Sequence, residues 1–156
     1  MEVRICIDVD DLERGIRFYT QGLGLTVGRR LGNDWVELLG AGSPIDLLAE
    51  KPGSPALAAP HEQQRDFSRH WTPVHLDFVV TGIDAAAARL MALGATLERP
   101  VQQRRWGRMA NFADPFGHGI DLLEFQGRGY DEMLNPRQPD TPANEAPAAP
   151  AGPATP

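Results

Sequence analysis

The sequence is poor in several features that define large classes of protein. Cys6 is the single cysteine among 156 residues, so an internal disulfide and a cysteine-based zinc cluster are both excluded. No apolar run approaches the roughly 18 residues that a transmembrane helix needs, and the first residues lack the basic and apolar stretches of a signal peptide. Basic residues number 15 against 21 acidic residues, which counts against nucleic-acid binding. We therefore expect a protein of the reducing cytoplasm that binds neither membranes nor nucleic acid.

Large apolar side chains are absent from the last part of the chain. Residues 136–156 contain no Leu, Ile, Val or aromatic residue, and they hold seven of the 14 prolines. Such a segment cannot bury enough apolar surface to offset the entropy that is lost when it orders. The composition predicts a disordered Pro/Ala-rich tail over 136–156 and a folded domain over 1–135.

Within the domain, the sequence repeats itself. Residues 3–9 (VRICIDV) and 74–80 (VHLDFVV) both alternate apolar with polar or mixed positions, which is typical of a strand with one buried face. The two segments lie 71 positions apart, and the tetrapeptide Ile-Asp-Leu-Leu occurs at both 45–48 and 120–123. Self-similarity of this kind indicates two copies of one supersecondary unit.

A helix is predicted after each of these strands. Asp10 and Glu13 have the spacing of a capping box, and apolar residues recur at helical spacing after them. In the second copy Thr81 is the expected cap, with Asp84 three residues later.

Three strand-like runs follow each helix. They cover about 25–31, 34–39 and 44–49 in the first copy, and about 95–103, 106–113 and 119–125 in the second. We therefore predict an α+β fold of two βαβββ modules, about 1–50 and 73–126, whose curled mixed sheets surround a shared cavity. In the linker over 51–72, the pair His70–Trp71 is interpreted as part of a solvated loop, with a lid over the cavity as the alternative.

The strand alternation also assigns side chains to one face of each sheet. The apolar face of each first strand should pack on its helix, which leaves the opposite face to line the cavity. Ionisable groups there must be paired, hydrated or functional, because a buried charge without a partner is strongly destabilising. The residues expected on this face are Arg4, Cys6, Asp8, Asp46, Leu48, His75, Asp77, Asp121, Leu123 and Phe125.

Two groups of residues carry a resemblance to a known superfamily. The first comprises residues 9–19 and the Gly-Leu-Gly-Leu of 22–25, and the second comprises 106–108 (WGR), 114–117 (DPFG) and 120–122 (IDL). They resemble, in this order, the first strand and helix and the closing hairpin and last strand of the vicinal oxygen chelate superfamily. That superfamily includes glyoxalase I, the extradiol dioxygenases, and the bleomycin and fosfomycin resistance proteins. The DPFG motif by itself is interpreted as a turn.

The resemblance implies a divalent metal site in the shared cavity, with one ligand from the first and one from the last strand of each module. Carried over by position, the four sites are Arg4, Asp46, His75 and Asp121. His75, Asp46 and Asp121 are thus candidate metal ligands, and this donor set suits one Fe, Mn, Ni or Zn ion. Arg4 departs from the pattern, because a guanidinium stays charged and cannot ligate a cation.

Two functional hypotheses follow from this departure. In the favoured one, Arg4 pairs with Asp46, Asp121 or both, and a glyoxalase- or bleomycin-resistance-like protein binds a small organic ligand without a full metal site. In the other, His75, Asp46 and Asp121 hold the metal ion of a lyase, isomerase or dioxygenase. The sequence does not decide whether the chain is an enzyme or which residues would be catalytic. A third hypothesis is an interaction protein that uses the fold without a ligand.

Under either hypothesis the candidate ligand-binding residues are Arg4, Cys6, Asp46, His75, Trp106 and Asp121. Many relatives pair their modules within one chain or across a dimer. Two arrangements are therefore possible: one chain builds the whole cavity, or two chains form a homodimer.

Overall fold

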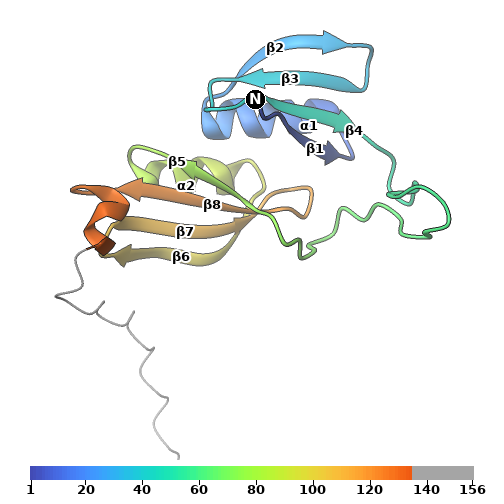
Figure 1. Ribbon diagram of the computed structural model, residues 1–156. Helices are drawn as coiled ribbons and strands as arrows, with labels where there is room; N and C mark the ends of the chain where they lie inside the picture. The colour runs from blue at the N-terminus through green and yellow to red at the C-terminus, as the bar shows by residue number, and fades with distance from the viewer. Residues whose placement is uncertain (135–156) are drawn as a thin grey trace, which may run out of the picture.

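The computed structural model describes residues 1–134 and consists of two modules (Figure 1). The first contains β1 (Ile5–Val9), α1 (Leu12–Arg17), the π-helical turn η1 (Phe18–Gly22), β2 (Thr26–Leu31), β3 (Trp35–Leu39) and β4 (Ile45–Ala49). The second contains β5 (Leu76–Val79), α2 (Ile83–Ala92), β6 (Thr96–Arg104), β7 (Gly107–Ala113), β8 (Gly119–Phe125) and the 3-10 turn η2 (Gly129–Leu134). The predicted α+β fold of two βαβββ modules is confirmed, and the tail predicted over 136–156 lies outside the described residues.

Each module forms a four-stranded mixed sheet with the same topology. The strand orders are β1-β4-β3-β2 and β5-β8-β7-β6. The first strand pairs in parallel with the last, because the intervening helix carries the chain back across the sheet, and the other pairs are antiparallel. The six strand-like runs expected after the helices all match observed strands to within one residue at each end.

The helices pack on the inner faces of the sheets, and α2 meets η1 between them. In Figure 1, α1 lies on the side of the first sheet that faces the second module, and α2 on the side of the second sheet that faces the first. Along β1 the side chains of Ile7 and Val9 are buried toward the helix, whereas Cys6 is exposed. The predicted division of each sheet into an apolar face and a polar face therefore holds, and the polar faces point away from the helices.

One apolar core runs through both modules. Tyr19 of the first module and Leu90 and Phe116 of the second all have exposed fractions of 0% and belong to the same buried cluster. Tyr19 donates a hydrogen bond from Oη to Asp114 Oδ2 at 2.7 Å. The other oxygen of Asp114 accepts the N–H groups of Phe116 and His118, both at 2.8 Å. Asp114, interpreted from the sequence as a turn residue, thus also joins the modules.

The predicted cap of the first helix is wrong by one residue. Asp11, not Asp10, is the cap: its Oδ1 accepts a hydrogen bond from the Arg14 backbone N–H at 2.9 Å. The backbone is still extended at Asp11 (φ −142°, ψ 111°), which is the conformation that a cap requires. The expected capping-box partner, Glu13, instead bonds Arg30 at 2.8 Å.

The cap of the second helix comes from a distant strand. The sequence predicts Thr81 as the cap, but the cap position is Gly82, at φ +74°. Because glycine has no side chain, it cannot itself bond the free N–H groups of the first turn. The Glu124 carboxylate of β8 accepts the N–H groups of Gly82 at 2.5 Å and Ile83 at 3.3 Å. Within residues 1–134 no helix is long and apolar enough to span a membrane.

Candidate functional site

The polar face of the first sheet carries a network of ion pairs around Arg4. Arg4 donates to both oxygens of Asp46, at 3.0 Å from Nε and 2.6 Å from Nη2, and to Glu37 Oε1 at 2.8 Å. Arg29 donates to both oxygens of Glu37, at 2.9 Å and 2.5 Å. Glu37 and Asp46 are buried, with exposed fractions of 4% and 7%. Both oxygens of Asp46 are therefore already engaged by a cation of the chain itself.

These pairs shift the pKa values of Glu37 and Arg4. Hydrogen bonds from Arg29 and then Arg4 lower the pKa of the Glu37 carboxyl to about 2. The bonds to Asp46 and Glu37 raise the pKa of Arg4 further above its ordinary value. The Arg4 guanidinium, held between two carboxylates, supplies the positive charge that a metal ion would otherwise supply at this position.

Cys6 lies beside this network and is an unreactive thiol by its surroundings. It is opposite Asp46 in the β1–β4 register. Desolvation raises the pKa of the Cys6 thiol, and the negative charges of Asp8 and Asp46 raise it further. A nucleophilic cysteine needs a lowered pKa, so the structure offers no support for covalent chemistry at Cys6.

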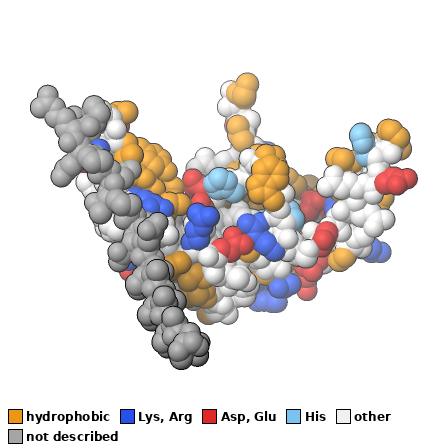
Figure 2. All heavy atoms as spheres, turned by 90° about the horizontal axis from the view of Figure 1, so that it is seen from below, with side chains coloured by type: hydrophobic (Ala, Val, Ile, Leu, Met, Phe, Trp, Pro, Cys, Tyr) orange, Lys and Arg blue, Asp and Glu red, His pale blue; other side chains and the backbone are white. Residues whose placement is uncertain are grey.

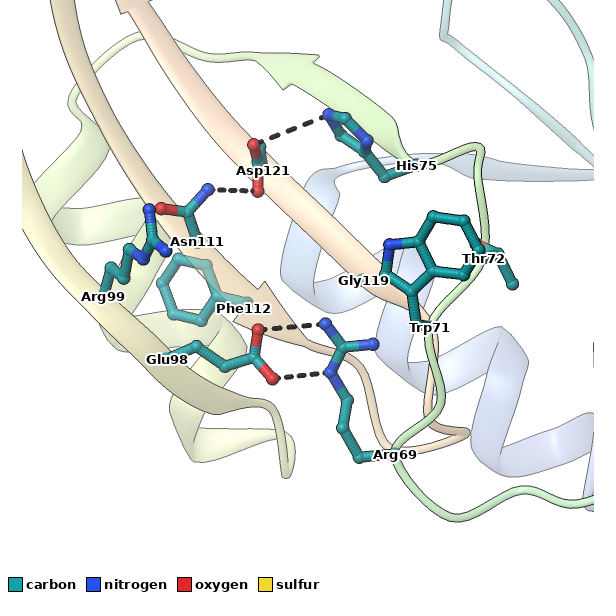
Figure 3. A pocket seen from close by; sticks show the side chains of 10 residues that line it. All are labelled: Arg69, Trp71, Thr72, His75, Glu98, Arg99, Asn111, Phe112, Gly119 and Asp121. Carbon is teal, nitrogen blue, oxygen red and sulfur yellow. Dashed lines mark hydrogen bonds and ion pairs between the residues drawn. The ribbon is translucent and has the colours of Figure 1, made fainter.

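On the polar face of the second sheet, three side chains could share one metal ion. One ligand atom each from His75, Asp77 and Asp121 lies within 4.8 Å of the others. His75 Nε2 is 3.2 Å from Asp77 Oδ1 and 3.8 Å from Asp121 Oδ2. Asn111 Nδ2 donates to Asp121 Oδ1 at 2.7 Å, which fixes that carboxylate and leaves its other oxygen directed toward His75 (Figure 3). As a donor set, one imidazole and two carboxylates fit a divalent transition metal.

The expected metal ligands are therefore not all brought together. The structure groups His75 with Asp121, as expected from the sequence, but the third member of this group is Asp77 and not Asp46. Within the described part of the chain, no hydrogen bond or ion pair joins Arg4 or Asp46 to His75 or Asp121. Asp77 could have been found from the sequence, because it lies two residues after His75 and thus on the same face of the strand.

The strand register extends this site into a row across the whole second sheet. Asp77 is opposite Asp121, Asp121 is opposite Asn111, and Asn111 is opposite Arg99. Desolvation raises the pKa of Asp77, and Asp121 raises it further, while His75 acts in the other direction. Asn111 and Arg99 were not among the site residues expected from the sequence, because a cross-strand partner depends on the register and on the β-bulges of β6.

A pocket of about 360 Å³ opens over this row of residues. It is lined by residues of the second module and of the chain just before it: Arg69, Trp71, Thr72, His75, Glu98, Arg99, Asn111, Phe112, Gly119 and Asp121 (Figure 3). Figure 2, which views the molecule from below, shows basic and acidic side chains close together in the middle of this side, beside hydrophobic ones. No residue of the first module lines this pocket.

The linker is fastened to the second module where it passes the pocket. Arg69 donates to both oxygens of Glu98, at 2.5 Å and 3.1 Å, and the His70 N–H donates to the Gly117 carbonyl at 3.2 Å. These contacts hold Trp71 at the pocket although 82% of its surface is exposed. The linker residues are thus part of the site.

Trp106 packs in an aromatic cluster beside the second sheet. Its ring packs edge-to-face against Phe125 and Tyr130, with centroids 5.8 Å and 5.0 Å away. Trp106 is not among the residues that line the pocket.

The comparisons with known proteins agree with this architecture. Residues 4–123 match the family model described as a glyoxalase-like domain. A fosfomycin resistance protein from Listeria monocytogenes has a similar structure (TM-score 0.63, 20% identity, 86% of this chain and 98% of that one). So does a glyoxalase-related enzyme from Fulvimarina pelagi (TM-score 0.61, 20% identity, 80% and 87%).

A glyoxalase/bleomycin resistance protein/dioxygenase from Nocardioides is 25% identical, with a TM-score of 0.56 over 83% of this chain and 85% of that one. A search of curated proteins finds no significant match. The family model covers most of the two modules, and its match agrees with the repeated βαβββ topology. The resemblance to the vicinal oxygen chelate superfamily is thereby confirmed, and the chain belongs to its glyoxalase-like domain family.

Proposed function

We propose that this protein binds a small organic ligand in the pocket on the second sheet, without a metal ion held jointly by the two modules. The observation that carries the proposal is the bidentate bond from Arg4 to Asp46. A metal ion bound at Asp46 would have to break this pair and would then face a fixed positive charge within a few ångströms. The pocket itself combines an aromatic wall with a few polar groups, which is typical of small-molecule sites.

We further propose that two chains of this cytoplasmic protein form a homodimer in which the pocket is covered. The pocket lies on the polar face of the second sheet, where the linker and η2 cover only part of the face: Tyr130 of η2 packs on Trp106 and Phe125. A second copy could place its first sheet over this face, which would bring both halves of the expected cavity together. Light scattering should then give about twice the chain mass of 17.0 kDa, whereas a monomer would contradict this part of the proposal.

A second function is supported by the group formed by His75, Asp77 and Asp121. If these residues hold a divalent ion, the ion would supply Lewis-acid chemistry for a lyase, isomerase or dioxygenase reaction. Asn111 would orient the Asp121 carboxylate through its 2.7 Å hydrogen bond, and such supporting contacts typically strengthen metal binding. In this version Asp77 takes the role that the sequence assigned to Asp46.

Elemental analysis of the purified protein separates the two functions. The favoured proposal predicts far less than one equivalent of Fe, Mn, Ni or Zn per chain, with no difference between the wild type and His75→Ala. It also predicts that ligands found in a thermal-shift screen stabilise the wild type in metal-free buffer and stabilise Trp71→Ala less. One equivalent of metal that is lost in both His75→Ala and Asp77→Ala, but kept in Asp46→Ala, would overturn it in favour of the metal-dependent function.

A further inference from the structure

Corresponding positions of the two modules differ in one pairing of charges. In the first sheet Glu37 of β3 is opposite Asp46 of β4, and both oxygens of Glu37 are bonded by Arg29 of β2. In the second sheet Asn111 of β7 is opposite Asp121 of β8, and Arg99 of β6 is opposite Asn111. A neutral amide thus stands beside Arg99, where the first module has a carboxylate beside its arginine.

Arg99 consequently has no carboxylate bonded to its guanidinium at the pocket. Within residues 1–134 its side chain makes no hydrogen bond or ion pair. Glu98 interacts electrostatically with Arg99, but both oxygens of the Glu98 carboxylate are already bonded by Arg69. The Asp121 carboxylate accepts from Asn111 and lies by His75. A guanidinium that lacks a protein partner in a concave site is well suited to bind an anionic group of a ligand.

Trp71 supplies the second recognition element of the pocket. Its ring lies across the pocket from Arg99 in Figure 3 and is 82% exposed, so its face is open to stacking. The bonds of Arg69 to Glu98 and of His70 to Gly117 fix the backbone on its N-terminal side. A planar ring stacked on an indole gains packing and quadrupole interactions at a small cost in entropy, because the indole is already positioned.

We propose that the ligand of this pocket is an aromatic anion, whose ring stacks on Trp71 and whose acidic group binds the guanidinium of Arg99. This inference rests on the proposed function and names its ligand class. The volume of about 360 Å³ accommodates a ligand of one to three rings. The missing side chain at Gly119 makes room for the Arg69 guanidinium beside the pocket, since a Cβ there would lie 3.2 Å from Arg69 Nη2.

Two fluorescent dyes that differ in one group test the proposal directly. 8-Anilino-1-naphthalenesulfonate carries a sulfonate, and N-phenyl-1-naphthylamine has the same rings without the charge. We expect the full-length wild type to bind the sulfonate about tenfold more tightly than the neutral dye. Arg99→Gln should remove this preference by weakening only the sulfonate, and Arg99→Lys should keep part of it. Trp71→Ala should weaken both dyes by about fivefold or more, in line with the usual size of a stacking contact.

Arg17→Gln serves as the matched control, because Arg17 is an exposed arginine at the end of α1, in the other module. It should leave both affinities unchanged, and circular dichroism should show all variants folded. Equal affinity of the wild type for both dyes, or equal weakening of both by Arg99→Gln, would overturn the role of Arg99. Unchanged affinities in Trp71→Ala would overturn the stacking role. Tight binding of the neutral dye alone would refute the anionic class but leave the proposed ligand-binding function standing.

Discussion

Glu37 is the residue through which we expect acid to weaken the first sheet. Its carboxyl has a pKa of about 2 in the folded protein, well below the ordinary 4.5, because Arg29 and Arg4 bond its charged form. A group with a lowered folded pKa contributes stability that is fully present above the ordinary value. That contribution is lost as the pH falls from about 4.5 through about 2.

Glu37→Gln should therefore lower the melting temperature at pH 7 by about 5 °C, a typical shift for losing charge-assisted hydrogen bonds in a domain of this size. The gap between wild type and variant should close as the pH falls from about 4.5 to about 2. Thermal melts followed by circular dichroism at several pH values would measure this gap. Glu2→Gln is a suitable control, because Glu2 is an exposed residue. A gap that stays constant down to pH 2 would contradict the assigned role of Glu37.

At the level of the element, α2 depends on a carboxylate that lies 41 or 42 positions away in the sequence. Glu124 accepts the N–H groups of Gly82 and Ile83 and thereby caps the helix from β8. Glu124→Ala should lower the free energy of unfolding by about 1 kcal/mol, the usual cost of a lost cap. Glu124→Gln should lose less, because its amide oxygen can still accept. Urea denaturation of the three proteins would measure the difference, and equal stability of wild type and Glu124→Ala would refute this capping role.

The first helix allows a sharper comparison of neighbouring residues. Asp11 accepts the Arg14 N–H, whereas the Asp10 carboxylate is 3.8 Å from the Arg14 guanidinium in an i,i+4 surface pair. Asp11→Ala should destabilise the protein by about 1 kcal/mol, but Asp10→Ala by no more than about 0.5 kcal/mol. The same urea experiment distinguishes them. The reverse order would restore Asp10 as the cap, as the sequence pattern suggested.

The helices and strands also show which structural features could be predicted from the sequence. Alternation and helical spacing are local properties, and they placed the strands after the helices to within one residue at each end. The cap from Glu124 and the row formed by Asp77, Asp121, Asn111 and Arg99 depend on strand register, which no local pattern specifies. The pairing of Arg4 with Asp46 was expected, because the two cavity-facing charges needed a partner. Asp77 rather than Asp46 lies beside His75, because the helices lie between the sheets and the polar faces of the two sheets point away from each other.

At the scale of the whole molecule, the helices between the sheets decide which faces remain open. Buried residues of both modules share one core, and Arg89 Nε donates to the Gly22 carbonyl across the junction at 3.4 Å. Because each module buries its apolar face against the other, neither has a complete core by itself. We expect denaturation to be a single cooperative transition for both modules, with fluorescence and circular dichroism giving the same midpoint.

Gly22 tests this packing most directly, because it lies where the two modules touch. A Cβ at Gly22 would be 2.8 Å from Leu90 Cδ2 and 3.3 Å from Leu93 Cδ1, and Leu90 is fully buried with little room to move. In a helical turn, exchanging glycine for alanine normally stabilises by about 0.5–1 kcal/mol. Here overpacking should outweigh that gain, so Gly22→Ala should lower the free energy of unfolding by about 1–2 kcal/mol. Gly42→Ala is the matched control, because a Cβ at Gly42 has no atom within 4 Å. A stabilised Gly22→Ala would contradict the tight packing of η1 against Leu90 of α2.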